Sequence, residues 1–173
     1  MRVNPRPKPN ESHSGEQQAM NYDHILIPTD GSKAAERATP HAVDLAKKYG
    51  ATLHVLFVVD IDAVDVSLGT EQVQRIKEGR FDEMEELKQY ATDALNRIAT
   101  KALDQGLDVE ESIVTGKPHK QIVKYAEKND VDLIAMTCHG RTGVRRLLLG
   151  SVTEQVLRLA GVPVLVVEME RSR

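Results

Sequence analysis

The sequence is poor in several residue types, and each shortage excludes a class of protein. Its 173 residues include one cysteine, so an internal disulfide and a cysteine-rich zinc site are both excluded. Such low cysteine use is typical of a reducing cytoplasm, which is the location that we expect. Tryptophan is absent and aromatic residues make up 3%, so few rings are available to stack on the bases of single-stranded nucleic acid.

Charge of one sign and long hydrophobic runs are also lacking. The chain has 23 Lys and Arg against 26 Asp and Glu, which gives a formal net charge of −3 at pH 7. A balanced surface argues against a protein that grips a nucleic acid over a broad face. No apolar stretch approaches the roughly 18 residues that a membrane span needs, and the N-terminus has no apolar segment typical of a secretory signal. We therefore expect binding to neither nucleic acid nor membrane.

Residues 1–20 differ in composition from the rest of the chain. They are polar, and Pro5, Pro7 and Pro9 fall at every second position. Such a stretch buries too little apolar surface to offset its ordering entropy. We predict a disordered N-terminal tail over 1–20 and one globular domain over 21–173.

Short apolar runs alternate with helical patterns after residue 20. The predicted strands are 24–28, 52–59, 107–114, 131–137 and 162–167, the third being more polar and therefore nearer an edge. The predicted helices are 33–49 capped by Ser32, about 70–105, one starting at Pro118, and 151–160, with a loop over 60–69. Gly79 is a position at which the helical region 70–105 can break or bend. Strands that alternate with helices predict a three-layer, doubly wound α/β domain with a mainly parallel sheet of about five strands.

The chain between residues 137 and 151 is the most informative for function. Gly140, Gly143 and Gly150 allow a backbone to approach a bulky anion, and Gly150-Ser151 lies at the start of a predicted helix. The free N–H groups and positive dipole end of a helix favour phosphate. Positive charge is added by Arg141, Arg145 and Arg146. A different interpretation needs no ligand, because Ser151-Val152-Thr153-Glu154 also fits a capping box.

Several further motifs, taken in order, resemble one known family. The segments are His24-Ile25-Leu26-Ile27-Pro28-Thr29-Asp30-Gly31-Ser32, Gly116-Lys117-Pro118, Val131-Asp132-Leu133-Ile134, His139-Gly140-Arg141-Thr142-Gly143 through Leu149-Gly150-Ser151-Val152-Thr153, and Val162-Pro163-Val164-Leu165-Val166-Val167. On these segments, residues 22–168 resemble a universal stress protein domain. The resemblance implies a Rossmann-like, adenine nucleotide alpha hydrolase-like fold with strand order 3-2-1-4-5.

Residues 137–151 resemble the pattern of that family's ATP-binding branch, which is Gly, two residues, Gly, nine residues, then Gly and Ser or Thr. Gly140 and Gly150-Ser151 match the pattern, but its first glycine is replaced by Thr137. The resemblance implies that Asp30 holds the ribose or a metal-bound phosphate and that Val58 offers backbone groups to adenine. The other implied nucleotide-binding residues are Pro28, Thr29, Met136, Thr137, His139, Gly140, Arg141, Gly143, Gly150, Ser151, Val152 and Thr153.

Three functions compete on this sequence. The first is a cytoplasmic stress-response regulator that binds ATP, with or without Mg²⁺, or else AMP or ADP, and hydrolyses it slowly at most, because no residue stands out as a base for water. The second, which Thr137 favours, is a dimer that binds no nucleotide and acts as a protein-interaction module. The third, an ATP pyrophosphatase or nucleotidyl transferase, lacks both the pyrophosphate loop and a His-x-Gly-His pair. We expect no catalytic residue and no resident metal site.

The last predicted strand points to a partner. An apolar strand at a sheet edge promotes aggregation unless it is covered. Residues Val162-Glu168 resemble the strand that pairs across a two-fold axis in this family. The resemblance therefore implies a homodimer through Val162-Glu168, with a further protein partner that the sequence does not identify.

Overall fold

The computed structural model describes residues 21–63, 74, 78, 84–138 and 149–168. The predicted tail over 1–20 lies outside these residues, as do 169–173 at the other end of the predicted domain. Within the described residues, none of the helices combines the length and the apolar character needed to cross a membrane.

The five strands form one parallel sheet in the order β3-β2-β1-β4-β5, which confirms the predicted fold class and strand order. The strands are β1 (His24–Thr29), β2 (Thr52–Asp60), β3 (Val109–Gly116), β4 (Leu133–Thr137) and β5 (Val164–Val167). The more polar β3 lies at one edge, as its composition predicts, and β5 lies at the other. The chain builds outward from β1 to β3 and then returns to the opposite side of β1 to add β4 and β5.

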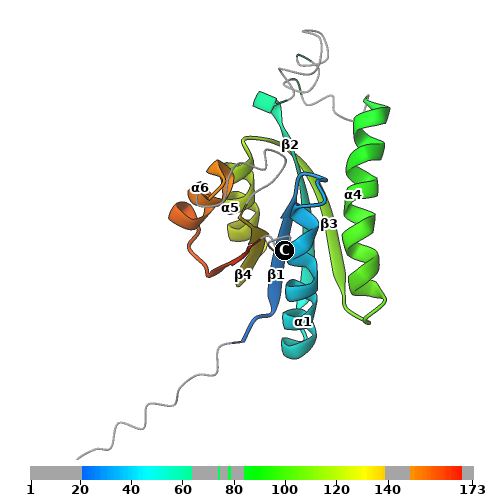
Figure 1. Cartoon of the computed structure of the whole chain (residues 1–173), viewed down its shortest axis with the longest axis vertical. Helices are drawn as coiled ribbons and strands as arrows, with labels where there is room; N and C mark the ends of the chain where they lie inside the picture. The colour runs from blue at the N-terminus through cyan, green and yellow to red at the C-terminus, as the bar shows by residue number, and fades with distance from the viewer. Residues whose placement is uncertain (1–20, 64–73, 75–77, 79–83, 139–148, 169–173) are drawn as a thin grey trace, which may run out of the picture.

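Helices cover both faces of the sheet (Figure 1). The elements are a 3₁₀ helix η1 (Ala35–Ala38), α1 (Thr39–Tyr49), α4 (Glu85–Leu103), α5 (Pro118–Lys128) and α6 (Ser151–Leu159). Helices α1 and α4 pack on one face against alternate residues of β1 and β2, such as Ile25 and Leu53. Helices α5 and α6 pack on the other face around Leu26 and Leu56. Because both faces are covered, β1 and β2 are apolar along nearly their whole length.

Two predicted helices differ from the structure. The helix expected over 33–49 is divided into η1 and α1, with the division just before Pro40. Proline has no N–H to donate to the carbonyl four residues earlier, so a continuous α-helix cannot pass through this position with all its bonds. The helix expected over 70–105 is also not continuous, because Met84 is non-helical and α4 begins at Glu85. Residues 61–63, expected in a loop, are helical.

A buried histidine lies near the amino-terminal ends of the strands. His54, 2% exposed, lies with its Nε2 3.0 Å from Nδ1 of His24 and with its own Nδ1 3.2 Å from the Tyr125 hydroxyl. Glu110 approaches the same Nδ1 at 3.5 Å, and Ser112 lies 3.4 Å from the Tyr125 hydroxyl. Burial lowers the pKa of His54, and the neighbouring His24 lowers it further, while the Glu110 carboxylate acts in the opposite direction. We therefore expect His54 to be neutral at pH 7.

Candidate functional site

The strand order places the candidate ligand site at the carboxyl ends of β1 and β4. The chain departs from β1 in one direction to form β2 and in the other to form β4, so the topological switch point lies between β1 and β4. Open α/β sheets bind ligands at this point. The β1–β2 ladder runs from His24 through Thr29, whereas the β1–β4 ladder pairs only Ile25 and Leu26 with β4. The two central strands are therefore not paired along their carboxyl-terminal halves.

Strand β2 extends beyond β1 at this edge. Its ladder with β1 ends at Phe57, which pairs with Thr29, but its ladder with β3 continues to Asp60. Residues 58–60 consequently pair with β3 and lie past the end of β1. The predicted ligand residue Val58 occupies this extension and is buried among core residues of the α5 and α6 face. A backbone contact from Val58 to a ligand above β1 is compatible with this position, whereas its side chain belongs to the core.

The turn after β1 is held by local hydrogen bonds. The N–H of Gly31 donates to Oγ1 of Thr29 at 3.0 Å, and the N–H of Ser32 donates to Oδ1 of Asp30 at 2.9 Å. The Ser32 hydroxyl in turn accepts the N–H of Ala35 at 3.2 Å, so it caps the turn leading into η1 instead of the long helix predicted. Gly31 has φ +80°, a conformation that glycine adopts without steric cost. Asp30, half-buried, thus stands at the carboxyl end of the first strand in a defined turn.

The start of α6 is attached to the end of β4. The N–H of Gly150 donates to the carbonyl of Cys138 at 2.7 Å, and the buried Thr153 hydroxyl donates to the carbonyl of Thr137 at 2.9 Å. The first bond inside the helix runs from Glu154 N–H to the Gly150 carbonyl at 2.9 Å. The amides of residues 151–153 precede that bond and have no acceptor within the helix. Their position beside the end of β4 places the positive end of a helix dipole at the switch point.

The capping-box interpretation of Ser151 is wrong. Gly150 has the extended backbone of an N-cap residue, with φ −60° and ψ 149°, and α6 begins at Ser151 itself. A capping box requires the serine at the N-cap, where its oxygen accepts an amide of the first turn. In the structure Ser151 is the exposed first residue of the helix, and the cap has no side-chain hydrogen bond.

The predicted site residues reach this edge from three directions. The end of β1 and the turn after it contribute Pro28, Thr29 and Asp30, β4 contributes Met136 and Thr137, and the N-cap and first turn of α6 contribute Gly150, Ser151, Val152 and Thr153. Met136 packs in the same core cluster as Val58, and Val152 lies partly buried against it. The predicted residues His139, Gly140, Arg141 and Gly143 lie outside the described residues.

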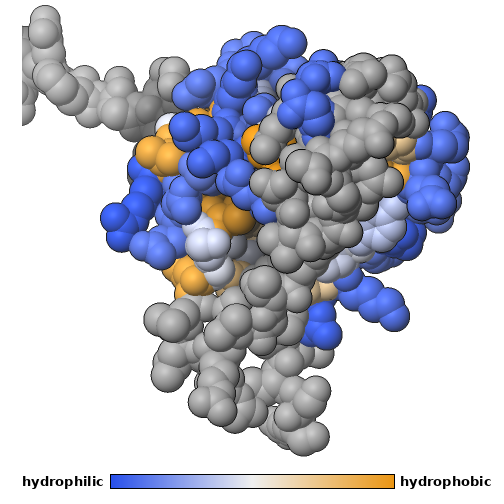
Figure 2. All heavy atoms as spheres, turned by 90° about the horizontal axis from the view of Figure 1, so that it is seen from above, coloured by the Kyte–Doolittle hydropathy of each residue, from blue (hydrophilic) through white to orange (hydrophobic). Residues whose placement is uncertain are grey.

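The residues at this edge of the sheet combine two kinds of chemistry. A helix N-terminus with free amides favours phosphate oxygens, and a carboxylate such as Asp30 accepts hydrogen bonds from sugar hydroxyls. Figure 2 views the molecule from this end, and the described residues seen there are mostly hydrophilic, with scattered hydrophobic ones.

Within the described part of the chain, no group of three His, Cys, Asp or Glu side chains is arranged to hold a metal ion. The buried thiol of Cys138 occupies a core position at the end of β4.

Helix α4 supplies contacts to the β1 turn that the sequence does not predict. The Tyr90 ring lies against Gly31, and Nη2 of Arg97 donates to the Gly31 carbonyl at 3.1 Å. Nε of Arg97 also pairs with Glu36 of η1 at 2.6 Å. Arg97 is 66 residues from Gly31 in the chain, and its place on an exposed helix face carries no local sequence signal for such a contact.

Comparisons with known proteins agree with this geometry. The sequence model of the universal stress protein family matches residues 21–168. Universal stress protein MJ0531 of Methanocaldococcus jannaschii is 37% identical over 152 residues, covering 87% of this chain and 85% of the relative. Universal stress protein MJ0577 of the same organism is 35% identical over 158 residues, covering 87% and 98%.

Solved structures show the same likeness. The structure of MJ0577 superposes with a TM-score of 0.73 at 34% identity, covering 88% of this chain and all of that one. A universal stress protein in complex with cAMP superposes with a TM-score of 0.60 at 25% identity, covering 86% and 98%. Family match, sequence identity and fold therefore agree, and the chain belongs to the universal stress protein family.

Proposed function

We propose that this protein binds an adenine nucleotide, with ATP as the first candidate, at the carboxyl ends of β1 and β4. The observation that carries the proposal is the attachment of the α6 N-terminus to the end of β4 through Gly150 and Thr153. In this proposal the α6 amides bind phosphate oxygens, and the Asp30 carboxylate accepts hydrogen bonds from a ribose. The related structure in complex with cAMP supports an adenine nucleotide as the ligand class.

The proposed role is regulatory. ATP, with or without Mg²⁺, or AMP or ADP in its place, would stabilise the segment between β4 and α6 and so change the surface offered to a protein partner. Hydrolysis would be slow at most, because no residue of the sequence stands out as a base that could activate water. The remaining parts of the proposal are a stress-response role in the cytoplasm and a homodimer.

The dimer proposal rests on β5. This strand is an edge of the described sheet, all four of its residues are half-buried, and Leu157 and Leu159 of the preceding helix are exposed. A second copy pairing along Val162-Glu168 would extend the sheet and cover this strand. Sedimentation or light scattering at micromolar concentration measures this directly.

Binding of ATP is tested by isothermal calorimetry with MgATP on the full chain. We expect measurable affinity in the native protein and its loss in Gly150→Val, because the added side chain stands where phosphate would meet the amides. Gly161→Val is the matched control, since a Cβ there meets open space at the other end of α6. Asp30→Ala is expected to weaken binding. No detectable binding at millimolar MgATP would refute the proposal.

A second function is favoured by Thr137. Thr137 is 6% exposed and takes the place of the first glycine in the ATP-binding pattern, so a branched side chain is present where backbone alone is expected. If this side chain fills the adenosine position, the protein acts as an interaction module without a nucleotide. Thr137→Gly discriminates the two functions, because ATP binding that appears only in this variant would support the interaction module.

A further inference from the structure

The conformation of the β1 turn depends on helix α4. Gly31 has φ +80°, and a Cβ built there would lie 2.6 Å from the Tyr90 hydroxyl oxygen, so the ring packs directly on the turn. Tyr90 itself meets Phe57 of β2 edge to face, with ring centroids 6.0 Å apart. The turn that contains Asp30 is therefore covered by α4, a helix that is distant from it in sequence.

Arg97 connects this turn to the element that follows it. Its Nη2 donates to the Gly31 carbonyl at 3.1 Å while its Nε donates to Glu36 at 2.6 Å. The Glu36 side chain is 15% exposed, and Lys101 reaches its other oxygen at 3.7 Å. One guanidinium thus holds both ends of the segment from Gly31 to Glu36. A lysine at this position has a single nitrogen and cannot reproduce the fork.

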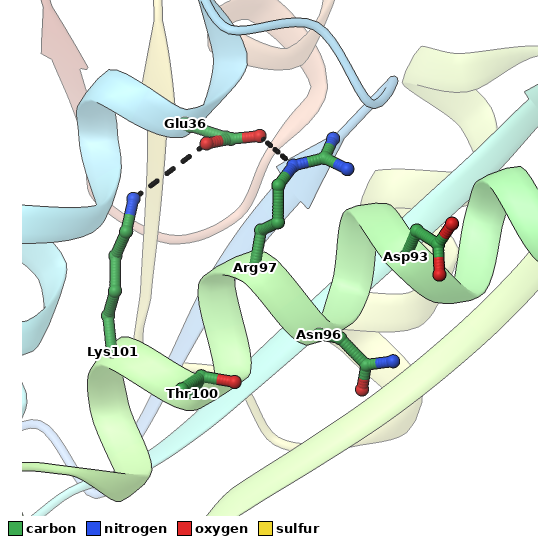
Figure 3. Close-up of a pocket in the computed structure, with 6 residues that line it drawn as sticks. All are labelled: Glu36, Asp93, Asn96, Arg97, Thr100 and Lys101. Atoms are coloured by element: carbon green, nitrogen blue, oxygen red, sulfur yellow. Dashed lines mark hydrogen bonds and ion pairs between the residues drawn. The ribbon is translucent and has the colours of Figure 1, made fainter.

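An open groove of about 660 Å³ runs beside these residues between η1 and α4. Figure 3 shows Arg97 and Lys101 reaching from α4 toward Glu36, with Asp93, Asn96 and Thr100 along the same helix. The groove carries both signs of charge, so it selects neither an anion nor a cation. The guanidinium of Arg97 is accessible to solvent on the side that faces this groove, and 43% of the Arg97 side chain is exposed.

We infer that Arg97 is a positioning residue for the nucleotide site. By fixing the Gly31 carbonyl, it holds the turn in which the Ser32 amide donates to Oδ1 of Asp30, and so keeps the Asp30 carboxylate in the orientation that this bond defines. In this inference Arg97 acts on the nucleotide through the turn and Asp30. The inference rests on the proposed function for its effect on affinity, and on geometry alone for its effect on the turn.

The first experiment measures the turn without any ligand. Amide hydrogen exchange, followed by NMR, is compared in the native protein, Arg97→Met and Lys101→Met. We expect faster exchange of the Ser32 amide in Arg97→Met and little change in Lys101→Met, because Lys101 pairs with Glu36 but makes no bond to Gly31. Equal exchange of Ser32 in all three proteins would overturn the inference. This result holds whether or not the protein binds nucleotide.

The second experiment measures affinity for MgATP in a double-mutant cycle. Arg97→Met is expected to weaken binding about threefold to tenfold, the range of a single hydrogen bond, with Arg97→Lys in between. In an Asp30→Asn background the same change is expected to have almost no effect, because the two residues act in series. A merely structural role would weaken binding equally in both backgrounds, which would overturn the inference. Absence of binding in the native protein would refute the proposed function and leave the exchange result as the test of Arg97.

Discussion

The substitution Gly31→Ala tests whether α4 shapes the candidate site, and Gly50→Ala is its matched control. Both glycines are left-handed, with φ +80° and +69°, but a Cβ at Gly50 meets nothing within 4 Å, whereas at Gly31 it meets Tyr90. The two variants therefore share the backbone cost and differ in the steric one.

The magnitudes follow from these contacts. An L-residue in the left-handed region costs roughly 1–2 kcal/mol, and the loss of unfolded-state freedom on replacing glycine returns about 0.4–1 kcal/mol, so Gly50→Ala is expected to cost about 1 kcal/mol. At Gly31 the Tyr90 ring must also move away from Phe57, which forfeits an aromatic pair of about 0.5–1.5 kcal/mol and brings the total to about 2 kcal/mol.

Thermal and urea unfolding followed by circular dichroism measure both costs. In a domain of this size we expect Tm to fall by about 2–4 °C in Gly50→Ala and about 4–8 °C in Gly31→Ala. In a Tyr90→Ala background the two substitutions should cost the same, because the ring that clashes is gone. If Gly31→Ala remains the more costly one in that background, the contact with Tyr90 is not the reason, and the role assigned to α4 in shaping the turn is refuted.

Three further predictions concern stability and assembly. Burial lowers the pKa of His54 in the folded chain, so the free energy of unfolding should fall as pH drops below about 6.5, by at most about 1.4 kcal/mol per pH unit. His54→Gln should remove this pH dependence, which urea titrations at pH 7.5 and 5.5 measure. Among the described residues, the hydroxyl of Thr39 is the one buried side-chain oxygen without a hydrogen-bond partner, whereas the Thr153 hydroxyl is bonded. Unfolding experiments should therefore show that Thr39→Val stabilises the fold by about 1 kcal/mol and that Thr153→Val destabilises it by a similar amount. On the edge strand β5, Val166→Lys should convert a dimer to a monomer in light scattering, and Thr115→Lys on the opposite edge should not.

The sheet could be predicted from the sequence because its central strands carry their own signal. Residues 25–27 and 53–59 are apolar almost without interruption, which is the pattern of strands covered on both faces, and the observed ends differ from the predicted ones by a single residue. The order of the strands is a tertiary property. It came from the resemblance to a known family and not from these patterns.

The helices were predicted less well where one residue overrides a periodic pattern. Ala35, Ala38 and Ala42 continue at helical spacing through Pro40, but the missing N–H of proline divides the segment into a 3₁₀ turn and an α-helix. In the long helical region Gly79 is the residue at which a break or bend is expected, and the structure starts α4 just after Met84. In both regions, periodicity alone predicts a longer helix than the α-helix that the structure contains.

The candidate site contains some residues that local sequence motifs identify and others that only the folded structure brings to it. Asp30 and Gly150 are recognisable because each lies in a short motif of turn residues next to a strand or helix. The residues that hold these motifs in place are not recognisable, since Arg97 and Tyr90 reach Gly31 from α4 across roughly sixty positions of sequence. A carboxylate at a strand end is thus predictable, but its orientation is a product of packing.

The departure at Thr137 can be judged from the atoms that the structure uses there. The α6 N-terminus is attached to residue 137 by a bond from the Thr153 hydroxyl to its carbonyl, a group that every residue has. Exchange of glycine for threonine at this position therefore leaves the attachment intact, and any effect on the ligand comes from the side chain alone. Thr137→Gly isolates that effect. If nucleotide affinity rises while the Gly150 amide keeps its protection from exchange, the side chain narrows a site that the backbone has already built. If affinity is unchanged, threonine is accommodated, and the family's ATP-binding pattern tolerates a β-branched residue at its first position.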